Sequence, residues 1–181
     1  MEVKINNQMQ MRRVEMAAGL EQEIMRHAWL EVSRKRPLTE KILTRYENEL
    51  AWDEVSQNQQ IEWTIEMARR WTDKLNWKLL SRTANGEAIT TEGIAALADL
   101  WDWKELTANP NVKMTVELAE NYRTKWDWSA MAWRSWEGYD AREFYSRFFE
   151  RIPRTAFNGS KLHFALRLQE VEHLWQKINE Q

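Results

Sequence analysis

The segment Trp103-Lys104-Glu105-Leu106-Thr107 decides the fold, because close variants of it recur along the chain. The four variants are Trp29-Leu30-Glu31-Val32-Ser33, Trp52-Asp53-Glu54-Val55-Ser56, Trp77-Lys78-Leu79-Leu80-Ser81 and Trp128-Ser129-Ala130-Met131-Ala132. The tryptophan that leads each variant returns at a near-constant interval. A regular period of this kind is typical of stacked repeats, in which each unit packs on its neighbours.

A threonine in each unit marks the expected start of a second helix. It is found at Thr39, Thr64, Thr91 and Thr115, at a near-constant distance before the next leading tryptophan. Apolar residues follow three, four and seven positions later, as in an amphipathic helix, and threonine is a favourable N-cap. Asn76, Asp102 and Asp127 stand directly before three of the tryptophans, where they can cap the first helix. Each unit is therefore expected to be a helix hairpin of about 25 residues.

The predicted fold is all-α, with these hairpins stacked as an α-solenoid between helical caps. We expect an N-terminal capping helix in residues 1–26, five tryptophan-anchored repeats in residues 27–139 and a C-terminal helical cap in residues 140–181. The N-terminal helix should run from about Met9 to Met25 and cover the first repeat. Within the C-terminal cap, residues 141–150 and 161–178 are predicted helices. The three parts are expected to form one continuous structural domain.

The bulk composition excludes several classes of protein. The apolar fraction of 43% and the charged fraction of 30% are typical of soluble globular proteins. The formal charge of −2 argues against a general nucleic-acid binder. The absence of cysteine excludes disulfides, thiolate zinc sites and cysteine nucleophiles. Because the first eight residues lack the apolar core of a signal peptide and no run of 18 apolar residues occurs, we expect a cytoplasmic protein without a membrane partner.

The 12 tryptophans have two interpretations. Burying one tryptophan removes roughly 150–250 Å² from water, and short helices need contacts of that size to be stable. We therefore expect the periodic set to be structural anchors in the core: Trp29, Trp52, Trp77, Trp103 and Trp128. Trp63, Trp133 and Trp136 fall outside this set and are candidates for a contact surface.

Chemical motifs are scarce. Glu170-x-x-His173 has the spacing of a carboxylate-bridged metal motif, but such a site needs a second copy, and His27 and His163 do not provide one. No nucleophilic triad or phosphate-binding loop is present. The sequence predicts no enzyme, no metal and no cofactor. Basic pairs at Arg34 and Arg36 and at Arg69 and Arg70 could align on one face of stacked repeats, or could be balanced by neighbouring glutamates.

The segment Trp101-Asp102-Trp103-Lys104-Glu105-Leu106-Thr107-Ala108-Asn109-Pro110-Asn111, followed by Trp126-Asp127-Trp128, resembles tandem tryptophan-repeat proteins of bacteria and large DNA viruses. Their units read roughly Trp-Asp-Trp-x-x-Leu-Ser-x-Asn-Pro-Asn. The resemblance covers residues 27–139, and only the unit around Trp103 matches closely. The units at Trp29 and Trp52 lack the Asn-Pro-Asn turn, and the Trp77 unit has about one extra residue. The resemblance implies a helical array and supplies no catalytic residues.

The leading hypothesis is a non-enzymatic helical-repeat protein that binds another protein, as an adaptor, an inhibitor of the immunity type or an assembly component. An inhibitor could present Glu47, Glu49 and Glu54 to a basic target. The alternative is a nucleic-acid-binding solenoid that uses the two arginine pairs with Trp63 or Trp133. A third hypothesis is a homo-oligomer formed through an aromatic patch at Phe144, Tyr145, Phe148 and Phe149.

Overall fold

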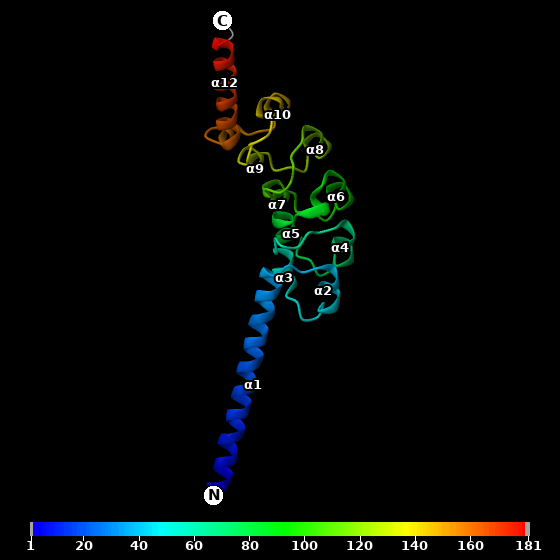
Figure 1. The fold of residues 1–181 in the computed structure, drawn as a ribbon, viewed down its shortest axis with the longest axis vertical. Coiled ribbons are helices and arrows are strands. Elements are labelled where there is room, and N and C mark those ends of the chain that lie inside the picture. Colours follow the sequence, from blue (N-terminus) through cyan, green and yellow to red (C-terminus); the bar gives the residue numbers. More distant parts are fainter. Residues whose placement is uncertain (1, 180–181) are drawn as a thin grey trace.

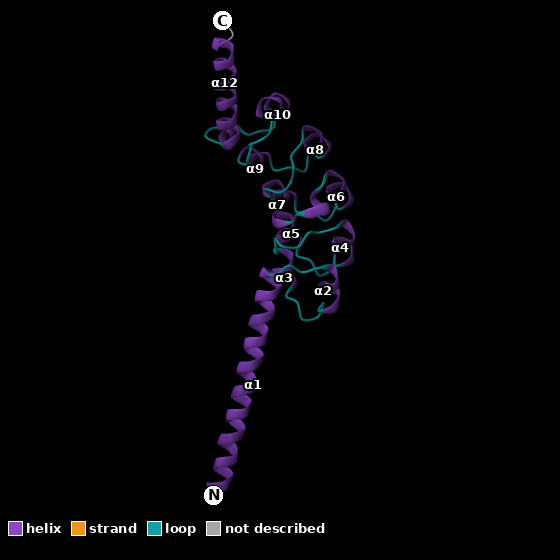
Figure 2. Ribbon diagram, viewed as in Figure 1, coloured by secondary structure: helices purple, strands orange, loops and turns teal. Residues whose placement is uncertain are grey.

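The computed structural model describes residues 2–179, with side chains from residue 10 onward, and every regular element in that range is a helix (Figure 2). In chain order the elements are α1 (Glu2–Lys35), α2 (Glu40–Arg45), α3 (Trp52–Ser56), α4 (Ile65–Arg70), α5 (Trp77–Thr83), the 3₁₀ helix η1 (Gly86–Ile89), α6 (Thr91–Ala96), α7 (Trp103–Ala108), α8 (Val116–Asn121), α9 (Trp128–Ala132), α10 (Ala141–Phe148), α11 (Arg154–Phe157) and α12 (Lys161–Asn179). The all-α class predicted from the sequence is confirmed.

The short helices form two columns between the two long terminal helices (Figure 1). The first column consists of the end of α1 followed by α3, α5, α7 and α9, and each of these contacts the next. The second column consists of α2, α4, α6, α8 and α10. The helix α11 packs on α9 and begins directly after Pro153, which stands where the period would place a sixth leading tryptophan. Both long helices extend along the longest axis of the molecule, from opposite ends.

We call residues 29–160 the body, residues 10–28 of α1 the N-terminal arm and α12 the C-terminal arm. Residues 9–25 are helical as predicted, but they do not form a separate helix that covers the first repeat. The helix continues through Trp29 to Lys35, and residues 10–28 are exposed. No proline interrupts residues 10–35, and Ala28, a strong helix former, stands directly before Trp29, so the helix can run on to Lys35 before Pro37 ends it.

Threonine caps open four of the second-column helices. The hydroxyls of Thr39, Thr64 and Thr115 each accept a hydrogen bond from the backbone N–H three residues later. In α6 the cap is Thr90, which accepts from Gly93 N at 3.1 Å, so the prediction of Thr91 is wrong by one residue. With Thr90 as the cap, the interval from cap to next leading tryptophan is identical in all four units.

The extra residue of the Trp77 unit lies before α6, in the segment that forms η1. The backbone of η1 packs so closely on α6 that a Cβ atom on Gly93 would lie 2.2 Å from the Glu87 carbonyl oxygen. Any larger residue at position 93 would push η1 away. This close approach explains why glycine stands where the equivalent residues Ile42, Met67 and Leu118 are large and apolar.

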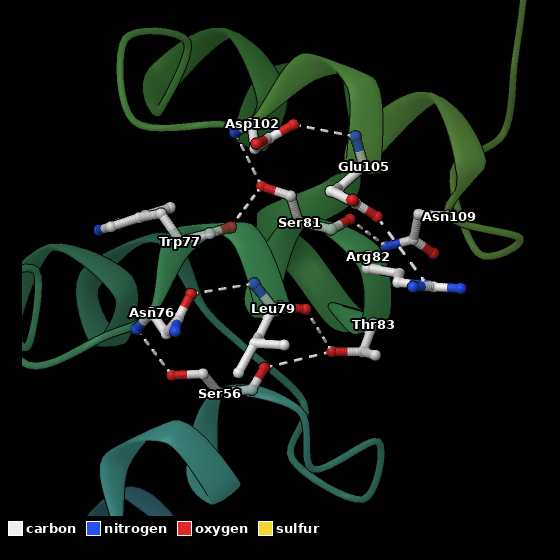
Figure 3. A network of polar contacts seen from close by, with 10 residues as sticks. All are labelled: Ser56, Asn76, Trp77, Leu79, Ser81, Arg82, Thr83, Asp102, Glu105 and Asn109. Atoms are coloured by element: carbon white, nitrogen blue, oxygen red, sulfur yellow. Dashed lines mark hydrogen bonds and ion pairs between the residues drawn. The ribbon is translucent and has the colours of Figure 1, made fainter. Parts of the chain in front are cut away.

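A buried hydroxyl joins each first-column helix to the next one (Figure 3). Ser81 Oγ donates to the Trp77 carbonyl oxygen at 2.6 Å and accepts from the Asp102 N–H at 2.9 Å. The equivalent inter-helix bonds run from the N–H groups of Ala51, Asn76 and Asp127 to the hydroxyls of Ser33, Ser56 and Thr107. All four hydroxyl residues are 0% or 1% exposed. Each bond therefore ties a helix start to its neighbour without competition from water.

A side-chain donor six residues after each leading tryptophan from Trp52 onward forms the second link. Asn109 Nδ2 donates to the Ser81 carbonyl oxygen at 3.0 Å and to that of Ala84 at 2.9 Å (Figure 3 draws the first bond). The residues at this position are Asn58, Thr83, Asn109 and Arg134, and their acceptors include the carbonyl oxygens of Ser33, Ser56, Ser81 and Thr107 respectively. Each of the four junctions thus combines the hydroxyl four residues after one leading tryptophan with the donor six residues after the next leading tryptophan.

Arg134 is the one charged residue in this series. It is 9% exposed, and its guanidinium donates to the carbonyl oxygens of Thr107 at 2.5 Å, Asn109 at 2.8 Å and Val112 at 2.5 Å. Burial lowers the pKa of Arg134. Three carbonyl oxygens replace the water that a buried guanidinium loses. Arg134 therefore has a structural role and does not present its charge to an anion in solution.

The five leading tryptophans are half-buried, although the sequence predicts them as core. Their rings pack against the buried cluster, as expected for anchors, and four of them donate Nε1–H to the carbonyl oxygen five residues earlier. For Trp103 this acceptor is Ala98, at 3.1 Å. The fully buried tryptophans are others: Trp63, Trp71, Trp101, Trp126 and Trp136. A leading tryptophan therefore covers the edge of the core and closes the turn before its own helix.

Candidate interaction surfaces

The predicted basic residues do not gather on one face. Arg34 and Arg36 lie at the end of α1 in the first column, whereas Arg69 and Arg70 end α4 in the second column (Figure 1). Arg34 Nε lies 3.6 Å from Glu54, and an Arg70 nitrogen lies 3.3 Å from Glu40. Arg69 donates to the carbonyl oxygen of Ala96. Three of the four arginines are thus engaged within the chain, while Arg36 is exposed.

Lysine ammonium groups lie over the rings of two leading tryptophans. Lys74 Nζ lies 5.7 Å from the Trp52 ring centroid and 3.1 Å from Glu47. Lys125 Nζ lies 5.1 Å from the Trp103 ring centroid and 3.8 Å from Asp99. These contacts leave neither tryptophan free as a flat stacking platform. Lys74 forms an ion pair with Glu47, and Arg34 forms one with Glu54. Two of the three glutamates considered for an inhibitor surface are therefore already paired within the chain.

Two of the three tryptophans predicted for a contact surface are buried. Trp63 is 1% exposed and Trp136 is 6% exposed, because both rings fill the interior of the body. The expectation that they contact a partner is therefore wrong. Trp133 is 52% exposed and remains available on the surface, at the end of α9.

The aromatic patch considered for self-assembly also packs inside. Phe144 and Phe148 are each 2% exposed, and Tyr145 stacks on Phe157 with ring centroids 4.8 Å apart. Only Phe149 is largely exposed. The side chains of α10 thus close the end of the core instead of presenting an aromatic face.

The histidines and their acidic neighbours do not converge. Glu170 pairs with Arg142 of α10 and not with His173. His163 Nδ1 accepts from the Gly159 N–H at 3.2 Å, and its ring packs on Phe157. Among the described side chains, residues 10–179, no three acidic or histidine groups are close enough together to hold a metal ion. No helix in the same range is both long enough and apolar enough to cross a bilayer.

The arms carry nearly all of the large apolar side chains that face solvent. Of the 14 such residues in the described chain, only Trp133 and Phe149 belong to the body. Those of the N-terminal arm are Met11, Val14, Met16, Leu20, Ile24 and Met25, and those of the C-terminal arm are Phe164, Leu168, Val171, Leu174, Trp175 and Ile178. Since single exposed apolar residues are ordinary but rows of them mark contact sites, the arms are the candidate interaction surfaces.

The helix α12 has two different apolar faces. Its first turns pack on α9 and α10 through Leu162, Leu166 and Gln169, and Gln169 Nε2 donates to the Tyr139 carbonyl oxygen. The opposite face, formed by Phe164, Leu168, Val171, Trp175 and Ile178, is exposed, and from Val171 onward none of its residues packs on the core of the body. Phe164 and Leu168 also line a groove of about 680 Å³ against residues 135–139. The sequence predicts a helix over residues 161–178, but its apolar pattern does not show which of these side chains face outward.

The described chain is thus all-helical, with a packed body and two helical arms that carry most of its exposed large apolar side chains. No family model, no curated protein and no solved structure matches this chain.

Proposed function

We propose that this protein is a non-enzymatic α-solenoid that acts as an adaptor or assembly component and binds protein partners, either other proteins or further copies of itself, through its arms. The proposal rests on the distribution of exposed large apolar side chains, six on each arm and two on the whole body between them. The recurring junctions at the fourth and sixth residue after each leading tryptophan support the solenoid arrangement.

The size of the exposed faces supports protein binding. Side chains of this size expose roughly 100 Å² each at these fractions, so that the five outer residues of α12 together leave roughly 500 Å² of apolar surface in water. The six on the N-terminal arm divide between two opposite sides of its helix, Met11, Val14 and Met25 on one and Met16, Leu20 and Ile24 on the other, with roughly 300 Å² on each side. Patches on monomeric proteins seldom exceed a few hundred Å² unless they bind something. Covering such a face would stabilise the complex by removing it from water.

The body supports the other hypotheses less well. An inhibitor of a basic target would need free acidic groups, and Glu47 and Glu54 are paired with Lys74 and Arg34. A nucleic-acid-binding surface would need a continuous basic track, whereas Arg34 and Arg70 lie in different columns and each pairs with a glutamate. The exposed Arg36 and Trp133 are the parts of the nucleic-acid hypothesis that stay available.

The test is affinity capture from the native source, with the full chain as bait and nuclease present. Val14→Glu with Met25→Glu places charge on one face of the N-terminal arm, and Leu168→Glu with Trp175→Glu does so on the C-terminal arm. Arg34→Glu with Arg69→Glu is the matched control on the body. We expect a stoichiometric protein to be captured by the control variant and lost with at least one arm variant.

Two results would contradict the proposal. Capture that both arm variants retain and the body variant loses would place the binding surface on the body. Recovery of RNA or DNA in the absence of nuclease, released by salt and abolished by Arg34→Glu with Arg69→Glu, would favour the nucleic-acid alternative.

A further inference from the structure

We propose that the outer face of α12 binds the same face of further copies of this chain, so that the C-terminal arms form a parallel, in-register helical bundle. This inference rests on the proposed function only in taking the arms as binding elements. It assigns the C-terminal arm to self-assembly and leaves the N-terminal arm for a different protein.

The spacing of the outer residues is that of a coiled-coil seam. Phe164, Leu168, Val171, Trp175 and Ile178 are separated by alternating steps of four and three residues, the heptad pattern that keeps one line of side chains facing a partner helix. All five are between 55% and 63% exposed. In heptad terms Leu168 and Trp175 occupy position a, and the other three occupy position d.

The flanking charges select copies of the same helix in parallel. Arg167 occupies position g and Glu172 occupies position e, five residues later. In a parallel bundle, position g of one helix faces position e of the next heptad in its neighbour, so Arg167 meets Glu172 of a neighbouring copy. Five residues apart on one helix, the two side chains point in different directions and cannot pair with each other. An antiparallel arrangement would bring like positions together and lose the pair.

The side chains themselves favour more than two strands. Leucine at position a and isoleucine at position d, here Leu168 and Ile178, are the residues that shift parallel coiled coils toward three or four helices. Leu174 at position g is also 49% exposed and widens the apolar face beyond a two-stranded seam. The body packs on the opposite side of α12, through Leu162 and Leu166, so the bodies would lie around the outside of the bundle.

The short seam is helped by preorganisation. Coverage of these five side chains would bury roughly 500 Å² on each helix, or roughly 1,000 Å² for a pair of neighbours, near the lower limit for a stable interface. Because α12 is already fixed at its base by contacts with α9 and α10, binding does not have to order a free peptide. The helix is already formed in each chain, so assembly does not have to supply the free energy of helix nucleation.

The first measurement is the molar mass of the pure full-length protein by light scattering over a wide concentration range. We expect three or four times the chain mass of 21.9 kDa. Leu168→Glu with Val171→Glu should give the monomer, and Met16→Glu on the N-terminal arm should leave the assembly unchanged. A monomeric wild-type protein, or an assembly that Leu168→Glu with Val171→Glu leaves intact, would overturn the proposal. A dimer that Leu168→Glu with Val171→Glu dissociates would support the outer face of α12 as the interface and reject a bundle of three or four helices.

The second measurement tests direction and pairing. Arg167→Glu should raise the concentration needed for assembly about tenfold by facing Glu172, and Arg167→Glu with Glu172→Arg should restore it, because opposite charges meet again. Since the chain contains no cysteine, Ile178→Cys can form a disulfide only with another copy. A parallel bundle brings these cysteines together, whereas an antiparallel one would separate them by about 20 Å. Failure to cross-link an assembled protein would reject the parallel arrangement.

The two proposals fail separately. Loss of self-assembly by the pure protein with continued capture of a different protein through the N-terminal arm would reject this inference and leave the proposed function intact. Self-assembly without capture of any other protein would support this inference and reject the proposal that the N-terminal arm binds a different protein.

Discussion

The body and the arms place the same residue types in opposite environments. Trp101 of the body is 5% exposed, whereas Trp175 of the C-terminal arm is 59% exposed. Polar groups show the reverse arrangement, since Ser81 and Asn109 are fully buried between neighbouring helices. The difference teaches that the body buries its own apolar side chains and joins its helices by internal hydrogen bonds, while the arms leave apolar surface for another molecule to cover.

The largest expected effect separates these two tryptophans. Trp101→Ala removes a buried ring and should lower the free energy of unfolding by about 3–5 kcal/mol, because the cavity cannot fill without moving neighbouring helices. Trp175→Ala should change it by less than about 0.5 kcal/mol in the monomer, because its ring is already in water. Denaturant unfolding at a concentration where the protein is monomeric measures both. Comparable losses would mean that the arm packs on the body.

A smaller effect tests the buried hydroxyl that joins α5 to α7. Ser81→Ala leaves the Asp102 N–H without its acceptor and should cost about 1–3 kcal/mol in free energy of unfolding. Ser81→Thr is the matched control, because Thr107 makes the same bonds at the next junction. It should cost clearly less than Ser81→Ala. If threonine were as damaging as alanine, the volume of the site and not its hydroxyl would determine the loss.

The smallest effect concerns Gly19 in the N-terminal arm. A Cβ added there meets no atom within 4 Å, so Gly19→Ala should stabilise the arm helix by about 0.5–1 kcal/mol through backbone entropy alone. Amide hydrogen exchange should slow in residues around position 19 while the unfolding midpoint of the body stays the same. A shifted midpoint would show that the arm and the body unfold together.

Much of the helical pattern was predictable from local residues. The threonine caps and the tryptophan period predict α2 to α9, and Asp140 and Ser160 stand before the helices found in the C-terminal region, where Asp140 accepts from Glu143 N and Ser160 from His163 N. These signals act within one turn of helix, so they need no knowledge of distant contacts. The error at Thr91 arose because Thr90 and Thr91 are equally good caps, and only the packing of η1 on Gly93 decides between them.

Burial was less predictable, because it depends on which helices meet. Trp63 resembles a stray aromatic residue in the sequence, yet its carbonyl oxygen accepts from Ala88 N and its ring is enclosed. The pattern of α12 shows apolar residues on several sides, but only the contacts of Leu162 and Leu166 reveal that the remaining ones face outward. The arginine pairs likewise needed the two columns of helices before their separation could be seen.

The identical positions at the junctions have a consequence for the length of the molecule. Residues 103–127 contain a tryptophan, a hydroxyl at Thr107 and a donor at Asn109, and they end on Asp127, which has the same role for α9 as Asp102 has for α7. A duplicated copy of this segment would carry every group that its two neighbours require. In the solenoid arrangement that we propose, adding or removing a whole unit would therefore change the distance between the arms and their relative direction by a fixed step.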